Sequence, residues 1–328
     1  MTSADVPAGM RLKEFAGWNQ TQEDWERFLE AEPEGCFVAE WNGQVAGTVA
    51  TIIYEQRFAW IGMVLVDPAL RGKGIGTALL IKAIDYLDAK RVPCMKLDAT
   101  PQGKPIYARL GFRIEYEIER HSLTRETTAD SRLESRQAVC NNHPLPPPYQ
   151  GGEPVVQLPS SARRGPGGGG QVSPLESYVE CSAGPRTASD VAVNLDALLE
   201  FDHKVFGADR SALLRSLAKS APELVAIHRS GGAVEGFALG RQGSLADQLG
   251  PWAAANASAA PAVFDDLLRR SLRPVVFVDV LRDNAWAPAL LADRGFQFSR
   301  SLTRMYRGEN AHPGRPELLG AILGPEFG

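Results

Sequence analysis

The segment from Trp60 to Leu87 constrains the fold more than any other part of this sequence. Trp60 to Val66 is a continuous apolar run of strand length, as found in strands that are buried on both faces. Arg71 to Gly76 then contains three glycines, and from Ala78 onward the apolar residues recur at spacings of three and four. That spacing predicts a helix with one apolar face, so the glycines stand at a helix start.

Glycines at the start of a helix favour phosphate binding. They let the backbone approach a ligand closely, and the free amide hydrogens of the first turn, together with the helix dipole, attract anionic oxygen. Two common phosphate-binding motifs do not fit. The Rossmann fingerprint needs a glycine where Thr77 stands, and a Walker loop needs Lys-Ser or Lys-Thr directly after its last glycine.

The run does match the acyl-CoA motif of the GNAT N-acetyltransferases, which is Gln or Arg, two residues, Gly, one residue, then Gly or Ala. Arg71, Gly74 and Gly76 stand at the required places. Val64–Pro68 and Ile106–Phe112 extend the resemblance, which covers roughly residues 9 to 124. The resemblance implies an α/β (α+β) fold, acetyl-CoA as co-substrate without a metal, and acetyl transfer to a primary amine through a tetrahedral intermediate.

The resemblance also implies roles for individual residues. In the family, the strand before the motif separates from its neighbour, and its backbone holds the pantetheine arm. Tyr107 stands where the family's general acid protonates the CoA sulfur, for which a phenol with a pKa of about 10 needs no special tuning. The alternative is a core tyrosine that stacks on the pantetheine. The implied acetyl-CoA contacts are Val64, Leu65, Val66, Arg71, Gly72, Lys73, Gly74, Ile75, Gly76 and Thr77.

The sequence says less about the catalytic base and about the acceptor site. Some family members carry a glutamate on the strand before the motif, and this strand has none. Asp98 is the first candidate base, Glu55 the second and a water chain the third; alternatively, Asp98 caps the loop that follows it. By resemblance, Trp18, Asn19 and Trp25 are candidates for the acceptor site, whereas large aromatic residues more often pack in a core.

The first half reads in order as strand, helix, three strands, helix, strand, helix and strand. The expected first strand is Met10–Phe15 and the expected first helix is Trp18–Leu29. Asn42 and Gly43 predict a type I′ hairpin turn, because both tolerate positive φ.

The second half looks like a degenerate copy of the first. Leu110-Gly111-Phe112 followed by Ser122–Arg125 resembles Arg294-Gly295-Phe296 followed by Ser301–Arg304, which suggests an internal repeat. Where the glycine-rich turn is expected, the second half has Leu249–Ala253, and Leu291 replaces Tyr107. We expect no acetyl-CoA turnover there, but a role in shaping the acceptor site or in dimerisation.

Composition divides the chain into four parts. Residues 1–126 form the predicted catalytic GNAT domain. Residues 127–186 are rich in proline and glycine without apolar periodicity, which predicts a largely disordered linker. Residues 187–308 form the predicted second GNAT-like domain and residues 309–328 a tail that docks on the body. Each domain is expected to contain a mixed, mostly antiparallel twisted sheet flanked by helices.

The overall composition is that of an ordinary globular protein. The formal net charge of -4 gives no general attraction to nucleic acid. No window approaches the roughly 20 apolar residues of a membrane span, so we expect a cytoplasmic protein with four reduced cysteines and no membrane partner. The expected function is N-acetyl transfer to a small-molecule or peptide amine by a monomer or homodimer. The alternative is an inactive acyl-CoA sensor or scaffold.

Overall fold

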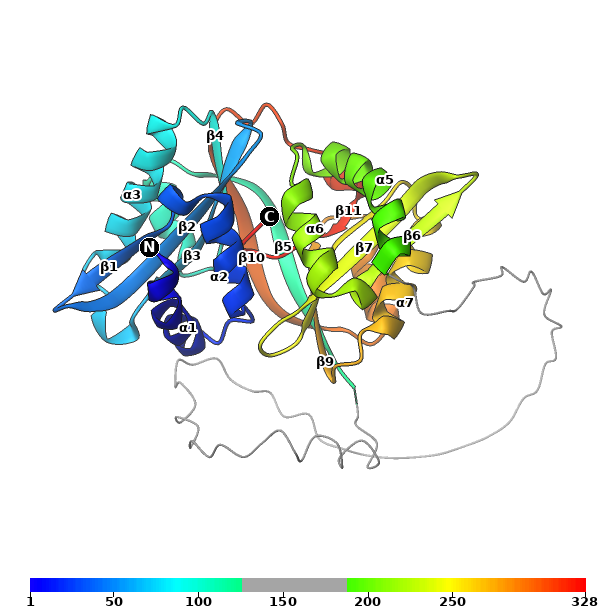
Figure 1. The fold of residues 1–328 in the computed structure, drawn as a ribbon, viewed down its shortest axis with the longest axis horizontal. Coiled ribbons are helices and arrows are strands. Elements are labelled where there is room, and N and C mark those ends of the chain that lie inside the picture. The colour runs from blue at the N-terminus through cyan, green and yellow to red at the C-terminus, as the bar shows by residue number, and fades with distance from the viewer. Residues whose placement is uncertain (126–187) are drawn as a thin grey trace. The chain divides into compact units, whose positions relative to one another are not determined.

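The computed structural model describes residues 1–125 and 188–328, which form one compact unit built on a single 11-stranded sheet (Figure 1). The strand order is β1-β2-β3-β4-β10-β5-β9-β11-β8-β7-β6. The elements of the first half are α1 (Val6–Phe15), α2 (Gln22–Ala31), β1 (Phe37–Trp41), β2 (Gln44–Tyr54), β3 (Phe58–Val66), α3 (Ile75–Ala89), β4 (Cys94–Ala99), α4 (Lys104–Arg109) and β5 (Arg113–Thr124). Those of the second half are α5 (Ala188–Phe206), α6 (Ser211–Ser220), β6 (Val225–Ser230), β7 (Ala233–Gln242), β8 (Asp247–Ala254), α7 (Ala259–Arg270), β9 (Val275–Leu281), α8 (Ala287–Asp293), β10 (Gln297–Gly308) and β11 (Leu319–Ala321).

The predicted mixed, mostly antiparallel sheet with flanking helices is confirmed. Among the strands that the structure describes, the parallel pairs are β3–β4 and β8–β9. The hairpin prediction is also confirmed, because Asn42 and Gly43 join β1 to β2 with φ of 51° and 76°. The predicted first strand, Met10–Phe15, is wrong, since these residues belong to α1.

Helix α1 forms because its buried residues recur at helical spacing. Val6, Gly9, Leu12 and Lys13 are buried, and Pro7 stands in the first turn, where its missing N–H is not needed. A Cβ on Gly9 would lie 2.9 Å from the ring of Trp25, so the glycine allows α1 and α2 to pack closely.

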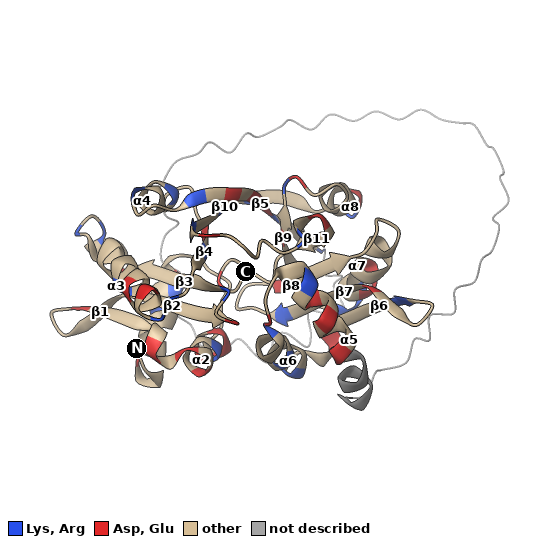
Figure 2. Ribbon diagram, turned by 90° about the horizontal axis from the view of Figure 1, so that it is seen from above, with Lys and Arg blue, Asp and Glu red and all other residues tan. Residues whose placement is uncertain are grey.

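The two halves exchange their last strands. Strand β10 of the second half lies between β4 and β5 of the first, and β5 in turn pairs with β9 of the second half. Figure 2 shows the central β5–β10 pair with α4 at one end and α8 at the other. The sequence did not predict this exchange, which makes one sheet out of two.

The repeat is real, but its register differs from the predicted one. Ile118 and Leu302 pair across β5 and β10, and they stand the same number of residues after Gly111 and Gly295. By the same count Arg304 corresponds to Arg120 and not to Arg125. The similarity of Ser122–Arg125 to Ser301–Arg304 is therefore a local coincidence, whereas the Gly-Phe match is a structural one.

Two buried arginine–aspartate pairs hold the exchanged strands β10 and β5 against strands of the other half. Arg304 on β10 donates to both carboxylate oxygens of Asp98 on β4 at 2.8 and 2.9 Å. Arg120 on β5 donates to both oxygens of Asp279 on β9 at 2.7 and 2.6 Å. Each pair joins a strand of one half to a strand of the other, at corresponding places in the repeat.

The hydrophobic core has three parts. One cluster gathers α1, α2, α5 and α6 on one face of the sheet and spans both halves. Figures 1 and 2 both place α2 beside α6, and Arg27 of α2 bonds Ser216 of α6. The other two clusters lie under α3 and under α7 with α8, one in each half.

The tail, residues 309–328, is part of this core. Ile322, Leu323 and Phe327 are fully buried in the shared cluster, and the ring of Phe327 stacks on Phe28 with centroids 4.8 Å apart. The expectation that the tail docks on the body agrees with this placement, and the contact extends to Gly328.

Some expectations lie outside the described residues. They are the linker at 127–186 and the thiols of Cys140 and Cys181. Cys36 and Cys94 are free and buried. Within residues 1–125 and 188–328, the helices are too short or too polar to cross a bilayer.

Candidate active site

Strand β3 separates from its neighbour β4 after its third residue. It pairs with β4 at Ala59 and Trp60, and the ladder ends there. Met63 has a φ of 55°, which is rare for a non-glycine residue, and the register with β2 shifts between Thr48 and Ala50. Beyond Trp60 the edge of β3 that faces β4 is therefore free, and Val64–Val66 belong to it.

The glycine-rich turn follows this free edge directly. Gly74 is the N-cap of α3, with φ of 80°, and has no side chain with which to cap the helix. Because the first backbone bond of the helix runs from Ala78 N to Gly74 O, the amides of Ile75, Gly76 and Thr77 remain available. An anion could bind at this end of α3.

The rest of the turn is exposed and held by local contacts. The Asp67 carboxylate accepts a hydrogen bond from Ala69 N at 3.0 Å, so Asp67 shapes the turn. Lys73 Nζ stands 4.6 Å above the ring of Trp41. A Cβ on Gly76 would lie 3.3 Å from the Val66 side chain, which shows how closely helix and strand approach.

Tyr107 lies on α4 next to the free part of β3. Its ring packs edge-to-face on Phe112 with centroids 6.1 Å apart, and a Cβ on Gly103 would lie 2.8 Å from it. Burial raises the pKa of the phenol to about 12. The ring is therefore held in place and its hydroxyl remains protonated at neutral pH.

Tyr107 borders a small cavity of about 70 Å³. Both halves and the tail contribute to its wall. The lining residues are Trp18, Gln20, Ile61, Gly62, Met63, Val64, Asp98, Thr100, Tyr107, Arg300, Leu302, Pro325 and Glu326. The cavity thus joins the free edge of β3 to side chains that are far away in the sequence.

Asp98 lines the cavity but is committed to another partner. Both of its oxygens accept hydrogen bonds from Arg304, and its side chain is fully buried. Burial raises the pKa of Asp98, and the Arg304 charge opposes that rise, so the base role of Asp98 stays a prediction. Glu55, the second candidate, bonds His203 at 2.9 Å and does not line the cavity.

The three predicted acceptor residues have different places. Trp18 lines the cavity. Asn19 is buried and holds the 243–246 loop, because its Oδ1 accepts from Leu245 N and Ala246 N at 2.9 and 3.0 Å. Trp25 is fully buried in the shared core. Asn19 and Trp25 therefore have structural positions outside the cavity wall.

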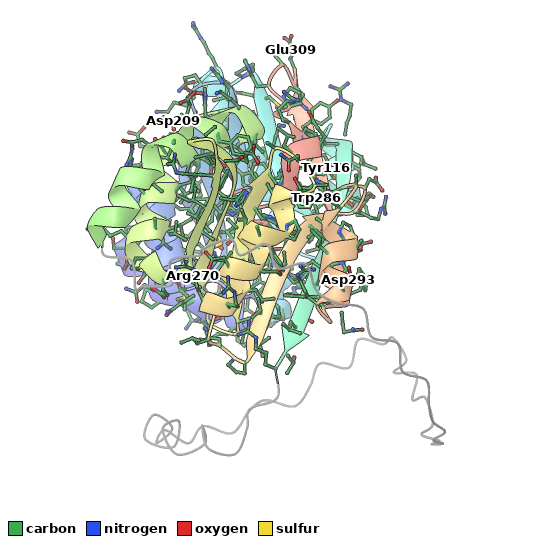
Figure 3. All side chains as sticks on the ribbon, turned by 90° about the vertical axis from the view of Figure 1, so that its right-hand side faces the viewer. Tyr116, Asp209, Arg270, Trp286, Asp293 and Glu309 are labelled. Carbon is green, nitrogen blue, oxygen red and sulfur yellow. The ribbon has the colours of Figure 1, made fainter. Side chains whose placement is uncertain are left out.

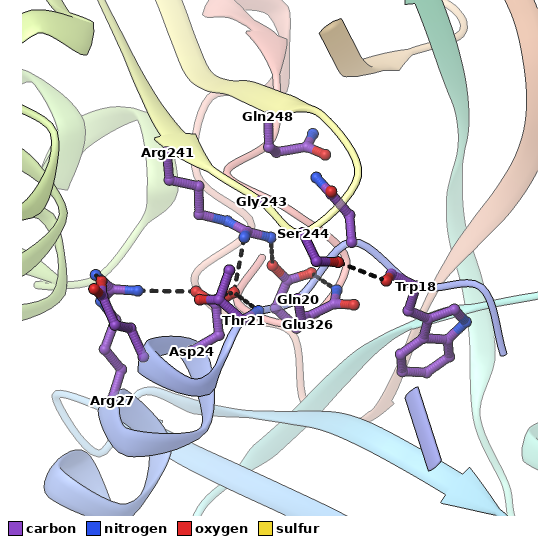
Figure 4. Close-up of polar contacts among 12 residues, drawn as sticks. Trp18, Gln20, Thr21, Asp24, Arg27, Arg241, Gly243, Ser244, Gln248 and Glu326 are labelled. Atoms are coloured by element: carbon purple, nitrogen blue, oxygen red, sulfur yellow. Dashed lines mark hydrogen bonds and ion pairs between the residues drawn. The ribbon is translucent and has the colours of Figure 1, made fainter. Parts of the chain in front are cut away.

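A buried polar network includes Gln20 and Glu326 of the cavity wall (Figure 4). Arg241 of β7 donates to Asp24 at 2.8 Å and also to Glu326. Gln20 Nε2 donates to the other oxygen of Glu326 at 2.8 Å. Burial raises the pKa of Glu326, and the Arg241 charge opposes that rise. The network ties the first half, the second half and the tail together at one point.

Sequence reasoning missed Gln20, Arg300, Leu302, Pro325 and Glu326. The last four come from β10 and the tail, and no local motif marks them. The only sequence feature that points to these residues is the internal repeat. A strand exchange between the copies would bring β10 beside Asp98, but nothing in a single sequence distinguishes exchanged strands from separate sheets.

The corresponding place in the second half is filled by the chain itself. The parallel ladders match Trp60 of β3 with Gln248 of β8, so that Val64–Val66 correspond to Trp252–Ala254. Strand β11 pairs with β8 at Trp252 and Ala253 and with β9 at Val280. It thus occupies the gap that stays open between β3 and β4.

The second half also lacks the turn and the tyrosine. Leu249–Ala253 was predicted to replace the glycine-rich turn, but it lies inside β8, and the turn itself is the short segment 255–258. Leu291, at the position of Tyr107, is fully buried in the core. A Cβ on Gly320 of β11 would overlap the ring of Trp286 (labelled in Figure 3), so β11 is packed tightly in the gap.

Comparison with known families matches both halves. Residues 10–112 match the model of the "Acetyltransferase (GNAT) family", and residues 198–320 match that of the "Acetyltransferase (GNAT) domain". The two matches lie on either side of residues 126–187, which the structure does not describe. The match in the first half includes β3, α3 and Tyr107.

Similar proteins include a holothin acyltransferase from Pseudoalteromonas sp. (strain SANK 73390), which is 25% identical over 95% of this chain and 87% of its own length. A mycothiol acetyltransferase from Acidimicrobium ferrooxidans is 28% identical over 30% of this chain and 37% of its own length.

Solved structures share the fold over the whole chain. A candidate acetyltransferase from Pyrococcus horikoshii superposes with a TM-score of 0.69 at 20% identity, covering 100% of this chain and 94% of its own. A GCN5-related N-acetyltransferase from Sphaerobacter thermophilus gives 0.56 at 18% identity, covering 96% and 95%.

Proposed function

Because this chain belongs to the GNAT acetyltransferases, as a tandem protein with one family domain in each half, we propose that it transfers an acetyl group from acetyl-CoA to a primary amine. The chemistry is assigned to the first half. The observation that carries the proposal is the free edge of β3 beyond Trp60, which leads directly into the uncapped N-terminus of α3 and borders the Tyr107 cavity.

The residues around this edge fit acetyl-CoA. The backbone of Val64–Val66 is free to pair with the amide-bearing pantetheine arm as a strand would. The amides of Ile75, Gly76 and Thr77 suit the pyrophosphate, with Arg71 and Lys73 as nearby cations. Acetyl-CoA supplies the activated acyl group, and the protein supplies its position.

Tyr107 is the proposed general acid. Its hydroxyl remains protonated at neutral pH because burial raises its pKa to about 12, and it borders the same cavity as Val64. The amine would enter that cavity, whose wall also includes residues of β10 and the tail. We assign the second half the role of completing the acceptor cavity, in agreement with an acyltransferase relative that is similar along 95% of this chain.

The test of the CoA site is Gly74→Glu. This change places a carboxylate at the proposed pyrophosphate site, where charge repulsion should weaken CoA binding by about 100-fold in calorimetric titration. Gly232→Glu is the matched control, because Gly232 has a similar φ (87° against 80°), equal free space and a place in the β6–β7 turn of the second half. Unchanged CoA affinity in Gly74→Glu would remove the basis for the assignment.

An acyl-CoA-binding sensor or scaffold is the second candidate, favoured by the absence of a glutamate from the strand before the glycine-rich turn and by the ion pair that engages Asp98. Release of free thiol from acetyl-CoA, followed over a panel of primary amines, separates the two. Tight CoA binding without thiol release above background for any amine would favour the sensor.

A further inference from the structure

Arg300 is a cation of the cavity wall to which the described residues supply no counter-ion. It lies on β10 and lines the cavity. Among residues 1–125 and 188–328, its guanidinium makes neither an ion pair nor a hydrogen bond, and its Nε is buried without a partner. Arg300 as a whole is only partly buried, but a buried N–H such as its Nε–H normally finds an acceptor, because leaving it unpaired costs desolvation energy.

The position of Arg300 in the sheet makes the lack of an anionic partner among the described residues more unfavourable. Arg300 stands directly opposite Arg120 across β10 and β5. Arg120 is neutralised by Asp279, which it binds through two hydrogen bonds. Like charges at opposite positions destabilise a strand pair, so the unpaired Arg300 calls for an anion. Burial, reinforced by the Arg120 charge, lowers the pKa of Arg300 to about 10, which leaves it charged at neutral pH.

The other charges of the wall are already balanced. Asp98 is paired with Arg304, and Glu326 with Arg241. Gln20 is nine-tenths buried, and while its Nε2 donates to Glu326, its Oε1 has no partner among the described residues. The cavity therefore offers one unmet cation and one unmet hydrogen-bond acceptor.

We propose that the acceptor is an amine that also carries a carboxylate, which Arg300 binds, while Gln20 Oε1 accepts a hydrogen bond from the amine end. This rests on the proposed function and names its substrate class as amino acids or similar amino carboxylates. A planar carboxylate fits the guanidinium fork and brings a single negative charge. A phosphate would bring about two, next to Asp98 and Glu326 on the same wall.

The experiment compares each of the common amino acids with its amide, which keeps the amine and removes the carboxylate charge. Thiol release from acetyl-CoA is measured for both. We expect at least one acid to be preferred over its amide, and Arg300→Met to lower kcat/KM for that acid by about 100-fold while leaving the amide nearly unchanged. Arg300→Lys should restore part of the preference. Arg269→Met, on the exposed surface of α7, is the control.

A binding arm keeps this inference separate from the proposed function. N-acetyl amino acids, the products of the reaction, are titrated into the CoA-bound protein while tryptophan fluorescence is followed, since Trp18 lines the cavity. Wild type should bind at least one of them about 100-fold more tightly than Arg300→Met does. If binding responds to Arg300 but thiol is never released, the proposed function fails and the carboxylate site stands.

Stability gives a readout that a purely structural arginine would not produce. Arg300→Met removes a partly buried cation that has no ion-pair partner among the described residues, and it should leave the melting temperature equal or higher. Arg304→Met, on the same strand, breaks a buried ion pair and should lower it by about 10 °C. The proposal is overturned if acids and amides are used equally, if no N-acetyl amino acid distinguishes wild type from Arg300→Met, or if Arg300→Met is as destabilising as Arg304→Met.

Discussion

Tyr107 is the residue on which the proposed chemistry depends most directly. Its phenol borders the cavity, and its edge-to-face contact with Phe112 holds the ring without engaging the hydroxyl. Tyr107→Phe keeps this packing and removes only the proton donor. We expect kcat to fall by about 100-fold or more, as for other general acids, with unchanged CoA affinity.

The pH dependence adds a second check on Tyr107. Because its pKa is raised to about 12, the phenol should lose its proton only above about pH 11. The kcat profile of the wild type should therefore show no falling limb below that pH. Equal rates for Tyr107→Phe and wild type across the profile would reduce Tyr107 to a packing residue.

Single residues differ in how far the sequence defines them. The position of Gly74 could be predicted, because a glycine-rich helix start has a local signature and the observed φ of 80° is one that glycine adopts easily. The partner of Asp98 could not, because Arg304 is 206 residues away in the chain. The same holds for Asn19, whose partners lie on the 243–246 loop.

At the scale of elements, β11 is what makes the second half differ from the first at the proposed CoA site. It pairs with β8 and β9 where the first half keeps β3 and β4 apart, and the tail then continues past Gly62 of β3, where a Cβ would lie 2.6 Å from Glu326 O. A strand already paired on this edge leaves no backbone for a pantetheine arm.

This arrangement predicts one CoA site per chain. Calorimetric titration of the full chain should give a stoichiometry of one, and Gly74→Glu should abolish the whole signal rather than half of it. A second, weaker binding event that survives in Gly74→Glu would contradict the blocked gap, because it would require β11 to leave β8 and β9.

Apolar periodicity alone does not predict every helix. Met10–Phe15 is short enough to suggest a strand, whereas the burial of Val6, Gly9 and Leu12 follows a helix that begins earlier. The longer α3 was predicted correctly, since its apolar face extends over four turns and is preceded by a clear start signal.

At the scale of the whole described unit, the exchange of β5 and β10 makes the cavity a joint product of both halves. Without β10, the first half would lack Arg300 and Leu302 on the cavity wall and the partner of Asp98. The repeat could be read from the Gly-Phe match, but pairing between copies is set by three-dimensional register, which a single sequence does not record. The domain boundaries at 126, 186 and 308 remain predictions.

A shared sheet and a shared core predict that the two halves unfold together. Calorimetry of the full chain should show one transition, because separating the halves would break the β4–β10 and β5–β9 ladders and expose the cluster that contains Phe28 and Phe327. CoA should raise the temperature of this single transition, although it binds only the first half.

Two matched variants make the same prediction sharper. Arg304→Met and Arg120→Met each break one of the corresponding buried pairs, to Asp98 in the first half and to Asp279 in the second. Each should lower the free energy of unfolding by about 3–5 kcal/mol, because the partner aspartate is left buried and unpaired. If the halves form one cooperative unit, both variants shift the same transition by similar amounts. Two transitions, with Arg120→Met moving one and CoA moving only the other, would mean that each half folds by itself and that the exchanged strands contribute little to cooperativity.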